Sequence, residues 1–192
     1  MNFLKLSLIP VLFSFLILAS ASFCFASTQV DNDKLNQNYQ LIAQGFEQLN
    51  MDAVNNIYVD QAVYISETQD KDIVFGRKNI IDLYQKFFNK IRHKKAKIEI
   101  DFRVVMRQLS ENQSTDVGYY LVKFHPGEDS GEPISEFAGK FVTVSTRTSD
   151  DEWKISVDSN TRSKPEFYYS AKPMPNWYYG RQFIQQITTQ SE

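Results

Sequence analysis

The feature that most constrains the fold is a pair of alternating segments between Gly139 and Asn160, joined by a polar, acidic turn. Residues 139–147 and residues 153–160 each alternate apolar with polar side chains, and the linking stretch Thr148–Glu152 carries three acids. Two alternating runs around a short polar turn are typical of a β-hairpin. We therefore predict a hairpin here, and it closes a run of strands that two amphipathic helices precede.

Three earlier segments also have strand patterns. Val117–Phe124 is apolar at nearly every position, which predicts a central strand covered on both faces. Ala62–Ser66 alternates like a short strand. From Ile98 the period is two, which predicts one buried face and one wet face. The buried set is Ile98, Ile100, Phe102, Val104 and Met106, and the wet set is Glu99, Asp101, Arg103 and Arg107.

Helical spacing appears in two places before those strands. One apolar stripe consists of Leu35, Tyr39, Ile42, Phe46 and Leu49, and a second consists of Ile80, Tyr84, Phe87 and Ile91. Steps of three and four residues place each stripe on one face of a helix. Asp52 can cap a short helix that runs through Tyr58, and Gly76 marks the start of the next one.

The N-terminal residues 1–26 have the layout of a secretory signal peptide. A weakly positive start precedes an apolar run, Leu6–Leu18, and small residues follow, with cleavage expected after Ala26 or Ala21. An uncleaved anchor is the alternative, because Leu6–Ala26 could span a bilayer. Cleavage predicts an exported protein, periplasmic or secreted, without a stable membrane span. Residues 27–34 then form a polar leader.

Cys24 is the only cysteine, and cleavage after Ala26 removes it. The mature chain would then hold no disulfide, cysteine nucleophile or thiolate metal site. The net charge of −2 comes from mixed charges without a long run, so nucleic acid is not an expected partner. The two histidines, His93 and His125, stand apart in the sequence, so we expect no metal, and no motif predicts a cofactor.

Two segments leave alternatives open. The basic cluster Arg92–Lys95, with Lys97, follows the second helix, where it either complements the helix dipole or forms a site for an anionic partner. The tail, residues 161–192, is rich in proline and aromatic residues and predicts a short helix over Asn176–Thr188. It either wraps its own domain, or forms a lid over a pocket or exchanges with a partner chain.

The order of these elements resembles the nuclear transport factor 2-like superfamily, and within it the polyketide-cyclase-like (SnoaL-like) branch. The stretches that carry the resemblance are Tyr58–Ser66, Gly76–Ile80, Gly118–Tyr120, Gly139–Val144, Glu152–Ile155 and Asp158. Together they span residues 35–160. The resemblance implies an α+β fold in which a strongly bent antiparallel sheet wraps around N-terminal helices to form a cone with a pocket, as in cystatin and ketosteroid isomerase.

Members of that superfamily include isomerases, dehydratases and cyclases, and also non-catalytic binding and dimerisation modules, so the fold leaves function open. When the isomerase pattern is laid on this chain, the catalytic base falls at Ser66, the oxyanion-hole tyrosine at Ile42 and the strand acid at Gly139. None of these residues can fill its role, although Glu67 and Tyr39 are neighbours. The chain therefore does not match the isomerase set, which weakens the case for an enzyme.

Asp158 is the remaining candidate for a catalytic residue, because polyketide-cyclase members can use an acid on a late strand as a base. Strict alternation places Asp158 on the face of Lys154 and Ser156, away from Trp153 and Ile155, unless a bulge intervenes. The alternative is that Asp158 bonds backbone groups of a turn at Ser159-Asn160.

Aromatic residues make up 14% of the chain. In a cone several of them must face the interior, either as a filled core or as the wall of an apolar cavity. The residues predicted to bind a ligand are Tyr58, Tyr64, Tyr84, Tyr120, Phe124, Phe141 and Trp153. We predict a small apolar ligand and a homodimer through the sheet. The alternatives are a lyase, isomerase or cyclase that uses Asp158 as base, and an adaptor whose binding element is the tail.

Overall fold

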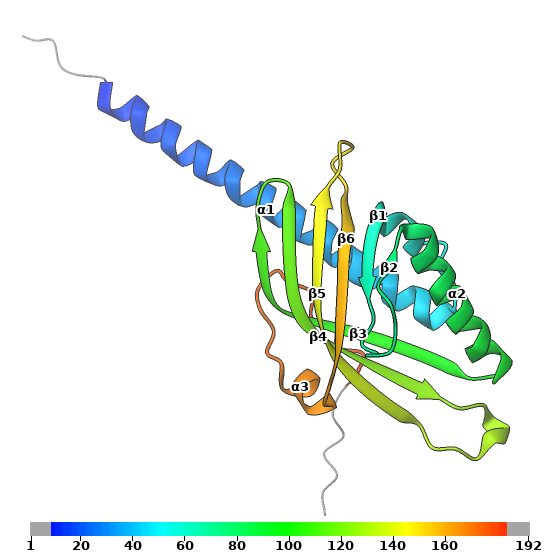
Figure 1. Ribbon diagram of the computed structural model, residues 1–192. Coiled ribbons are helices and arrows are strands. Elements are labelled where there is room, and N and C mark those ends of the chain that lie inside the picture. Colours follow the sequence, from blue (N-terminus) through cyan, green and yellow to red (C-terminus); the bar gives the residue numbers. More distant parts are fainter. Residues whose placement is uncertain (1–8, 184–192) are drawn as a thin grey trace, which may run out of the picture.

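The computed structural model describes the backbone of residues 9–183 and the side chains of residues 28–183. Its centre is one six-stranded sheet in the order β2-β1-β6-β5-β4-β3, strongly bent and unclosed (Figure 1). The strands are β1 (Tyr58–Ile65), β2 (Val74–Phe75), β3 (Lys97–Leu109), β4 (Gln113–His125), β5 (Ser135–Arg147) and β6 (Trp153–Ser163). The predicted hairpin is confirmed as β5 and β6, which are antiparallel.

Strands β3 to β6 form an antiparallel meander, as the resemblance predicted. One pairing differs, because β1 lies parallel to β6. The chain leaves β1 through β2 and α2, crosses to the opposite edge at β3, and returns strand by strand until β6 meets β1. A connection of that length is what a parallel pair needs.

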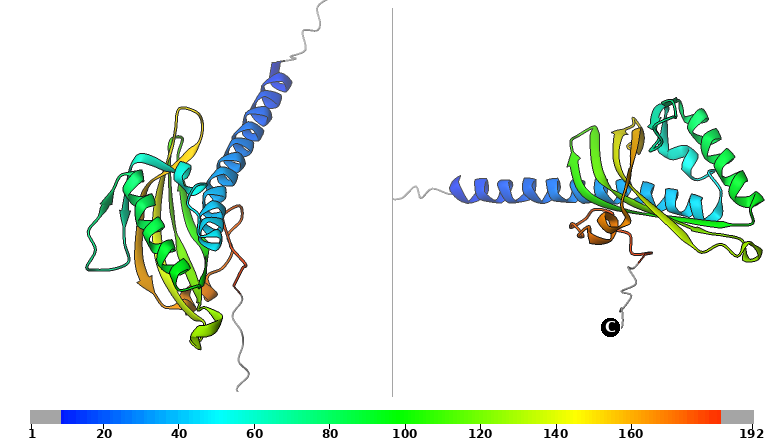
Figure 2. Two further views of the ribbon diagram at one scale, coloured as in Figure 1. Left: turned by 90° about the vertical axis from the view of Figure 1, so that its right-hand side faces the viewer. Right: turned by 60° about the horizontal axis from the view of Figure 1, so that its bottom comes forward.

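Helices α1 (Ile9–Gln48) and α2 (Arg77–His93) lie on the concave face of the sheet, where α1 packs against β3 and α2 against β1 (Figures 1 and 2). The predicted stripe of α1 is buried at Leu35, Tyr39, Ile42 and Phe46. Helix α2 buries Ile80, Phe88 and Ile91, while the predicted Tyr84 and Phe87 are half-buried. Both helices thus cover the inside of the cone.

Helix α1 runs without a break through the predicted polar leader, and its first half projects away from the sheet (Figure 1). Leader residues bind the sheet at the tip of the β5–β6 hairpin. Asp31 accepts bonds from Arg147 at 2.6 Å and from the indole of Trp153 at 3.0 Å. Within the part of the chain that the structure describes, no helix has both the length and the apolar character needed to cross a membrane.

Asp52 does not cap a helix, so that prediction is wrong. The short helix is a 3₁₀ turn, η1 (Val54–Ile57), whose N-cap position is Ala53 without a side-chain cap. The backbone N–H of Asp52 instead donates to Oδ1 of Asn50 at 2.9 Å. Tyr58 is already the first residue of β1, because buried Val54 and Ile57 hold the turn directly against the core.

The second face of β3 is not wet, contrary to prediction. Asp101 and Arg103 are 1% and 6% exposed because the C-terminal tail covers them. Arg107 is buried for a different reason. A bulge between Val104 and Met106 turns Arg107 to the concave face, where it pairs with Asp116 at 2.6 Å. The predicted alternation holds from Ile98 to Val104, but beyond the bulge it is wrong, because Arg107 is buried and Met106 is only half-buried.

The tail wraps its own domain, which is one of the two alternatives the sequence left open. Its short helix α3 (Pro165–Ser170) packs on β4 and β5, and Arg103 pairs with Tyr179 across a β-bridge. Residues 176–183 are not helical, so the predicted helix Asn176–Thr188 is wrong over that stretch, and the rest of it lies outside the described residues. Pairing with the edge of β3 replaces the helical hydrogen bonds.

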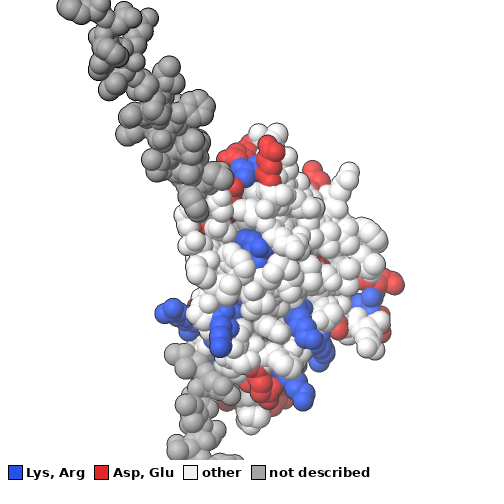
Figure 3. All heavy atoms as spheres, turned by 90° about the vertical axis from the view of Figure 1, so that its left-hand side faces the viewer, with Lys and Arg blue, Asp and Glu red and all other residues white. Residues whose placement is uncertain are grey.

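Strand β4 lies second from the edge of the sheet and is covered on both faces only in its middle, at Tyr120, Leu121 and Val122. Leu121 packs under the tail with Tyr168. The face that carries β3 and the tail shows Lys and Arg side chains separated by uncharged residues (Figure 3). The basic cluster begins in the last turn of α2, which includes Arg92 and His93, and does not follow the helix as predicted. Its side chains are exposed, and Nζ of Lys94 lies 5.9 Å from the ring centroid of Phe124.

Candidate functional site

A cavity of about 470 Å³ lies between the concave face of the sheet and the two helices. Its wall is largely apolar. Helices α1 and α2 contribute Ile42, Phe46, Leu83 and Phe87, and the sheet contributes Ile100, Phe102, Val122, Phe137 and Phe141. The volume and the apolar wall are typical of small-molecule sites. Of the two alternatives, a filled core and a hollow one, the structure has the hollow one.

Polar groups enter this wall at a few places. Asp158, Asn160, Thr143, Tyr64, Tyr84 and Tyr120 line the interior, and the loop between β1 and β2 contributes Ser66, Glu67, Thr68, Lys71 and Asp72. In a mostly apolar cavity of this kind, contact with the apolar wall provides most of the binding, and the few polar groups fix the orientation of the ligand.

Asp158 reaches the cavity because β6 contains a bulge. Val157 pairs with Val144, but Ile155 pairs with the next residue, Ser145, so Ser156 is an extra residue in β6. The Ser156 hydroxyl donates to the carbonyl oxygen of Val144 at 3.1 Å. The extra residue reverses the alternation, as a β-bulge does, and Asp158 therefore faces inward with an exposure of 8%.

Each carboxylate oxygen of Asp158 has one donor. The Tyr58 hydroxyl donates to Oδ2 at 2.9 Å, and Nδ2 of Asn160 donates to Oδ1 at 2.9 Å. The alternative in which Asp158 bonds a backbone turn is thereby wrong, because Ser159 and Asn160 continue the strand. Burial raises the pKa of Asp158 and the charge of Glu67 adds to it, while the two donors oppose them.

Three tyrosines surround this carboxyl. Burial raises the pKa of Tyr58, Tyr64 and Tyr84, and the nearby Asp158 raises each of them further. They therefore stay protonated and act as neutral hydroxyl groups. Tyr64 and Tyr84 line the cavity, while Tyr58 lies behind its wall with no exposed surface. Tyr58 thus supports Asp158 from outside the ligand space.

Tyr120 occupies the space above Gly139. The two residues are opposite each other in β4 and β5, and a Cβ on Gly139 would lie 2.2 Å from the ring carbon Cζ of Tyr120. The ring can lie flat on β5 only because residue 139 has no side chain. The resemblance placed the acid of the isomerase at Gly139, and in this chain a tyrosine hydroxyl stands there instead.

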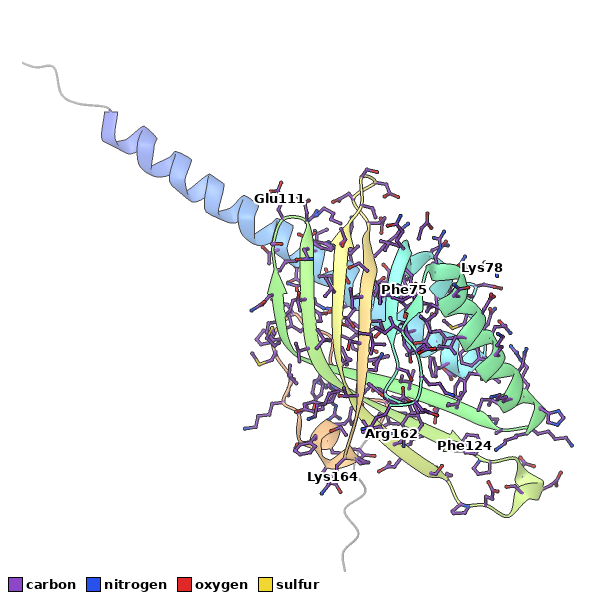
Figure 4. The ribbon with its side chains drawn as sticks, in the orientation of Figure 1. Phe75, Lys78, Glu111, Phe124, Arg162 and Lys164 are labelled. Carbon is purple, nitrogen blue, oxygen red and sulfur yellow. The ribbon has the colours of Figure 1, made fainter. Side chains whose placement is uncertain are left out.

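Tyr64, Tyr84, Tyr120 and Phe141 line the cavity, as does Asp158, whereas the other three predicted ligand-binding residues do not. Tyr58 lies behind the wall, as described above. Phe124 lies near the far end of β4, beyond the enclosed part of the cone (Figure 4). Trp153 is at the start of β6, where its ring stacks 4.8 Å from the guanidinium of Arg147 and its indole bonds Asp31.

Several lining residues were not predicted as ligand-binding residues. The sequence predicts Asn160 in a turn, but its spacing of two from Asp158 places both residues on one face of a strand. For Glu67–Asp72 the sequence predicts a polar loop, and no sequence signal places that loop at a cavity. The positions equivalent to the isomerase base and tyrosine, Ser66 and Ile42, do line the cavity but carry no suitable group.

The buried pair of Arg107 and Asp116 lies beside the cavity and supports its wall. Tyr39 lines the cavity, and its hydroxyl donates to Oδ2 of Asp116 at 2.8 Å. The hydroxyl proton is therefore already used in a hydrogen bond within the protein. Tyr39 thus cannot serve as the free donor that the isomerase pattern would need. Among the described residues, no three His, Cys, Asp or Glu side chains come together as a metal site.

The architecture is shared with solved structures of several bacterial proteins. A scytalone dehydratase-like protein from Novosphingobium aromaticivorans is 11% identical with a TM-score of 0.60, over 72% of this chain and 88% of that one. An NTF2-like superfamily protein from Salmonella enterica serovar Typhimurium is 11% identical with a TM-score of 0.58, over 71% and 92%. ActVI-ORFA from Streptomyces coelicolor is 14% identical with a TM-score of 0.57, over 68% and 96%.

These likenesses show that the chain has the nuclear transport factor 2-like fold, which the resemblance in the sequence predicted. No family model matches the sequence, and a search of curated proteins finds no relative. Proteins of this fold include dehydratases, isomerases and cyclases, so the chemistry has to be argued from the cavity itself.

Proposed function

We propose that this protein binds a small, mostly apolar molecule in the cavity of its cone. The observation that carries the proposal is an apolar cavity of about 470 Å³ in which Asp158 is the one buried carboxyl group among the described wall residues. Apolar surface on the ligand would be removed from water by the aromatic wall, and Asp158 with Asn160 would hold one polar group.

The test is direct binding. The protein is purified and examined by native mass spectrometry for a co-purified molecule, then titrated with uncharged aromatic compounds by calorimetry. Leu83→Trp narrows the cavity and should weaken binding, whereas Lys86→Trp, at an exposed position of the same helix outside the cavity, should not. Absence of any co-purified molecule and of any binding would contradict the proposal.

A second candidate is a lyase or isomerase in which Asp158 accepts a proton from carbon next to a carbonyl group. The observation that favours it is that Asp158 lies in the cavity with a raised pKa, which suits a general base better than an exposed carboxylate does. The neutral hydroxyl of Tyr120 could donate to the oxygen that becomes negative.

Proton transfer can be tested without knowing the substrate. A panel of aromatic and polycyclic ketones is incubated with the protein in D₂O, and deuterium incorporation next to the carbonyl is followed by NMR. Wild-type protein should accelerate exchange, and Asp158→Asn should not. If exchange is equally slow with both proteins, Asp158 is not a base for this class of substrate, and the binding proposal is unaffected.

We also propose that the protein is exported and that its signal peptide is removed. What supports cleavage after Ala26 is that Asp31 and Asn32, which tie α1 to the sheet, would remain in the mature chain. Mass spectrometry of the protein recovered outside the cytoplasm should find Ser27 or Ser22 at its N-terminus. Recovery of the intact chain in the membrane fraction would favour the anchor instead.

We also propose a homodimer through the sheet, and exposed apolar surface on its outer face supports this proposal. The tail covers the outer face over β3 and part of β4, but Val142 on β5 is 40% exposed. It pairs with Val117 of β4, and Val144 and Val157 continue the same face. This apolar strip on the outer face, defined by those four valines, is the part of the sheet where a second copy could bind.

A further inference from the structure

The charged groups around the cavity are mostly acidic. Among the described residues that line it, the ionisable acids are Glu67, Asp72 and Asp158, and the only basic residue is Lys71. Two of the acids and the lysine belong to the loop Glu67–Asp72, which contributes half-buried and exposed residues to the cavity wall. The charged part of this wall is therefore predominantly acidic.

The four groups differ in depth. Asp158 is buried and Glu67 is half-buried, and both line the cavity. Lys71 is exposed, and its ammonium group lies 3.9 Å from a carboxylate oxygen of Asp70, with side-chain exposures of 65% and 76%. The single cation thus lies in water beside another acid, and it does not neutralise the two interior carboxyl groups.

The electrostatic influence of Glu67 extends across the cavity. Its charge raises the pKa of Asp158, and it also raises the pKa of Tyr64 and of Tyr120 on other strands. The charge of Arg162 lowers the pKa of Tyr120, but Arg162 is exposed and does not line the cavity. The neutral donors that remain free for a ligand include the Tyr120 hydroxyl, which has no hydrogen-bond partner in the described part of the chain.

We propose that the cavity selects uncharged or cationic ligands and excludes carboxylates and other anions. This inference rests on the proposed binding function and adds the ligand class to it. An anion would lose its hydration in an apolar space and meet Glu67 and Asp158 without a buried counter-ion. A carbonyl or hydroxyl group can accept from Tyr120, and an ammonium group can pair with Glu67.

The experiment uses three probes with the same ring and nearly the same size: naphthalene-2-carboxamide, 2-naphthylmethylammonium and 2-naphthoate. Each is titrated into the full domain by calorimetry at pH 7. The amide and the amine should bind, and the naphthoate should bind at least about tenfold more weakly than the amide, because like charges without a counter-ion are costly.

Glu67→Gln should reduce the preference for amide over naphthoate, and Asp72→Asn, at an exposed position of the same loop, should reduce it less. Asp129→Asn, an exposed acid in a distant loop, should leave the preference unchanged. Naphthoate binding as tight as amide binding would overturn the ligand class while leaving the cavity as a binding site. If Glu67→Gln left the ratio unchanged, the assignment to Glu67 would be wrong. If none of the three probes bound, the proposed function would fail together with the inference.

Discussion

At the scale of single residues, the most consequential group is the buried carboxyl of Asp158, which within the described part of the chain has one side-chain donor for each oxygen. Both donors oppose the effect of burial, so the carboxyl can ionise in a space that otherwise disfavours charge. Tyr58 provides one of these donors without touching the cavity. It is a positioning residue for Asp158, not a ligand contact.

Asp158→Asn should change how stability depends on pH. Because burial raises the pKa of Asp158 in the folded protein, its stabilising contribution is complete below the unfolded pKa, about 3.9, and is lost as pH rises through the folded pKa. The variant should therefore gain stability relative to wild type as the pH rises above about 4, by about 1.4 kcal/mol per unit of the pKa shift. Urea unfolding at several pH values measures this, with Asp129→Asn as control. Parallel pH profiles would contradict it.

Tyr58→Phe should raise the pKa of Asp158 further, because Oδ2 loses the hydrogen bond from the Tyr58 hydroxyl. We expect the free energy of unfolding to fall by about 1–3 kcal/mol, the cost of an unsatisfied buried polar group. The titration of the Asp158 side-chain carbon, followed by NMR, separates this effect from a general loss of stability. Tyr169→Phe, which removes an exposed hydroxyl bond to Glu136, is the control and should leave that titration unchanged.

At the scale of elements, glycines on neighbouring strands decide how the aromatic wall is arranged. Gly118 and Gly139 lie under the rings of Phe141 and Tyr120, respectively. Each aromatic residue is opposite its glycine in the β4–β5 ladder. This crossed arrangement keeps two large rings flat against the sheet and leaves the space above them open.

Gly139→Ala should displace the Tyr120 ring, since the added Cβ would lie 2.2 Å from it. We expect a loss of about 1–3 kcal/mol, the usual cost of overpacking, together with altered binding of uncharged ligands. Urea unfolding and calorimetry measure both. The control is Ser135→Ala, at an exposed position of the same strand. Unchanged stability and binding would show that the ring moves without cost.

The tail is held to β3 by two charged residues of the strand. The Arg103 guanidinium lies between the rings of Tyr168 and Tyr179, at 4.1 and 4.6 Å from their centroids, and donates to backbone carbonyls of the tail. Asp101 accepts from the hydroxyls of Tyr168 and Tyr178. The tail carbonyls and hydroxyls supply the hydrogen bonds that these buried charges require.

Arg103→Met should loosen the tail, because the carbonyls of Tyr168 and Tyr169 lose their donor. Amide hydrogen exchange should become faster over residues 165–183, and also at the N–H of Val104, which bonds the carbonyl of Tyr178. Exchange in β5 and β6 near Asp158 should change little. Arg162→Met, at an exposed arginine, serves as the matched control. Protection of the tail equal to wild type would mean that Arg103 is not what holds it.

At the scale of the whole molecule, the two faces of the sheet have different roles. The concave face and the helices enclose the cavity, while the convex face is partly covered by α3 and the tail (Figure 2). The uncovered apolar strip on the outer face is separated from the cavity by the thickness of the sheet. Self-association there would leave the cavity accessible.

Val142→Lys places a charge in the middle of the apolar strip and should disrupt a dimer that uses it. Light scattering after gel filtration should find a dimer for wild type and a monomer for the variant. Lys140→Glu, two residues away on the same face, tests whether any change of charge on this face disrupts the dimer as Val142→Lys does. A monomeric wild-type protein would contradict the dimer proposal but not the binding proposal.

The sequence by itself determined the helical stripe of each main helix, the strands from Ile98 to Asn160 and the order of these elements. The stripe of α1 and the hairpin of β5 and β6 follow from periodicity, which is a local property of the chain. The fold could be predicted because the whole series of elements resembles one superfamily. The aromatic content also indicated a pocket, and four of the seven predicted ligand-binding residues, with Asp158, do line the cavity.

Only the tertiary structure decided where those residues point. One extra residue at Ser156 brings Asp158 inside, and one at Val105 turns Arg107 inward, although neither bulge has a signature in the alternation. The burial of Arg103 and the place of Glu67 in the cavity wall depend on segments far away in the sequence. Periodicity shows which residues of a strand share a face, because it is a local property of the chain. The position of a bulge, the burial of a face and the residues that line a cavity depend on the segments that pack against the strand.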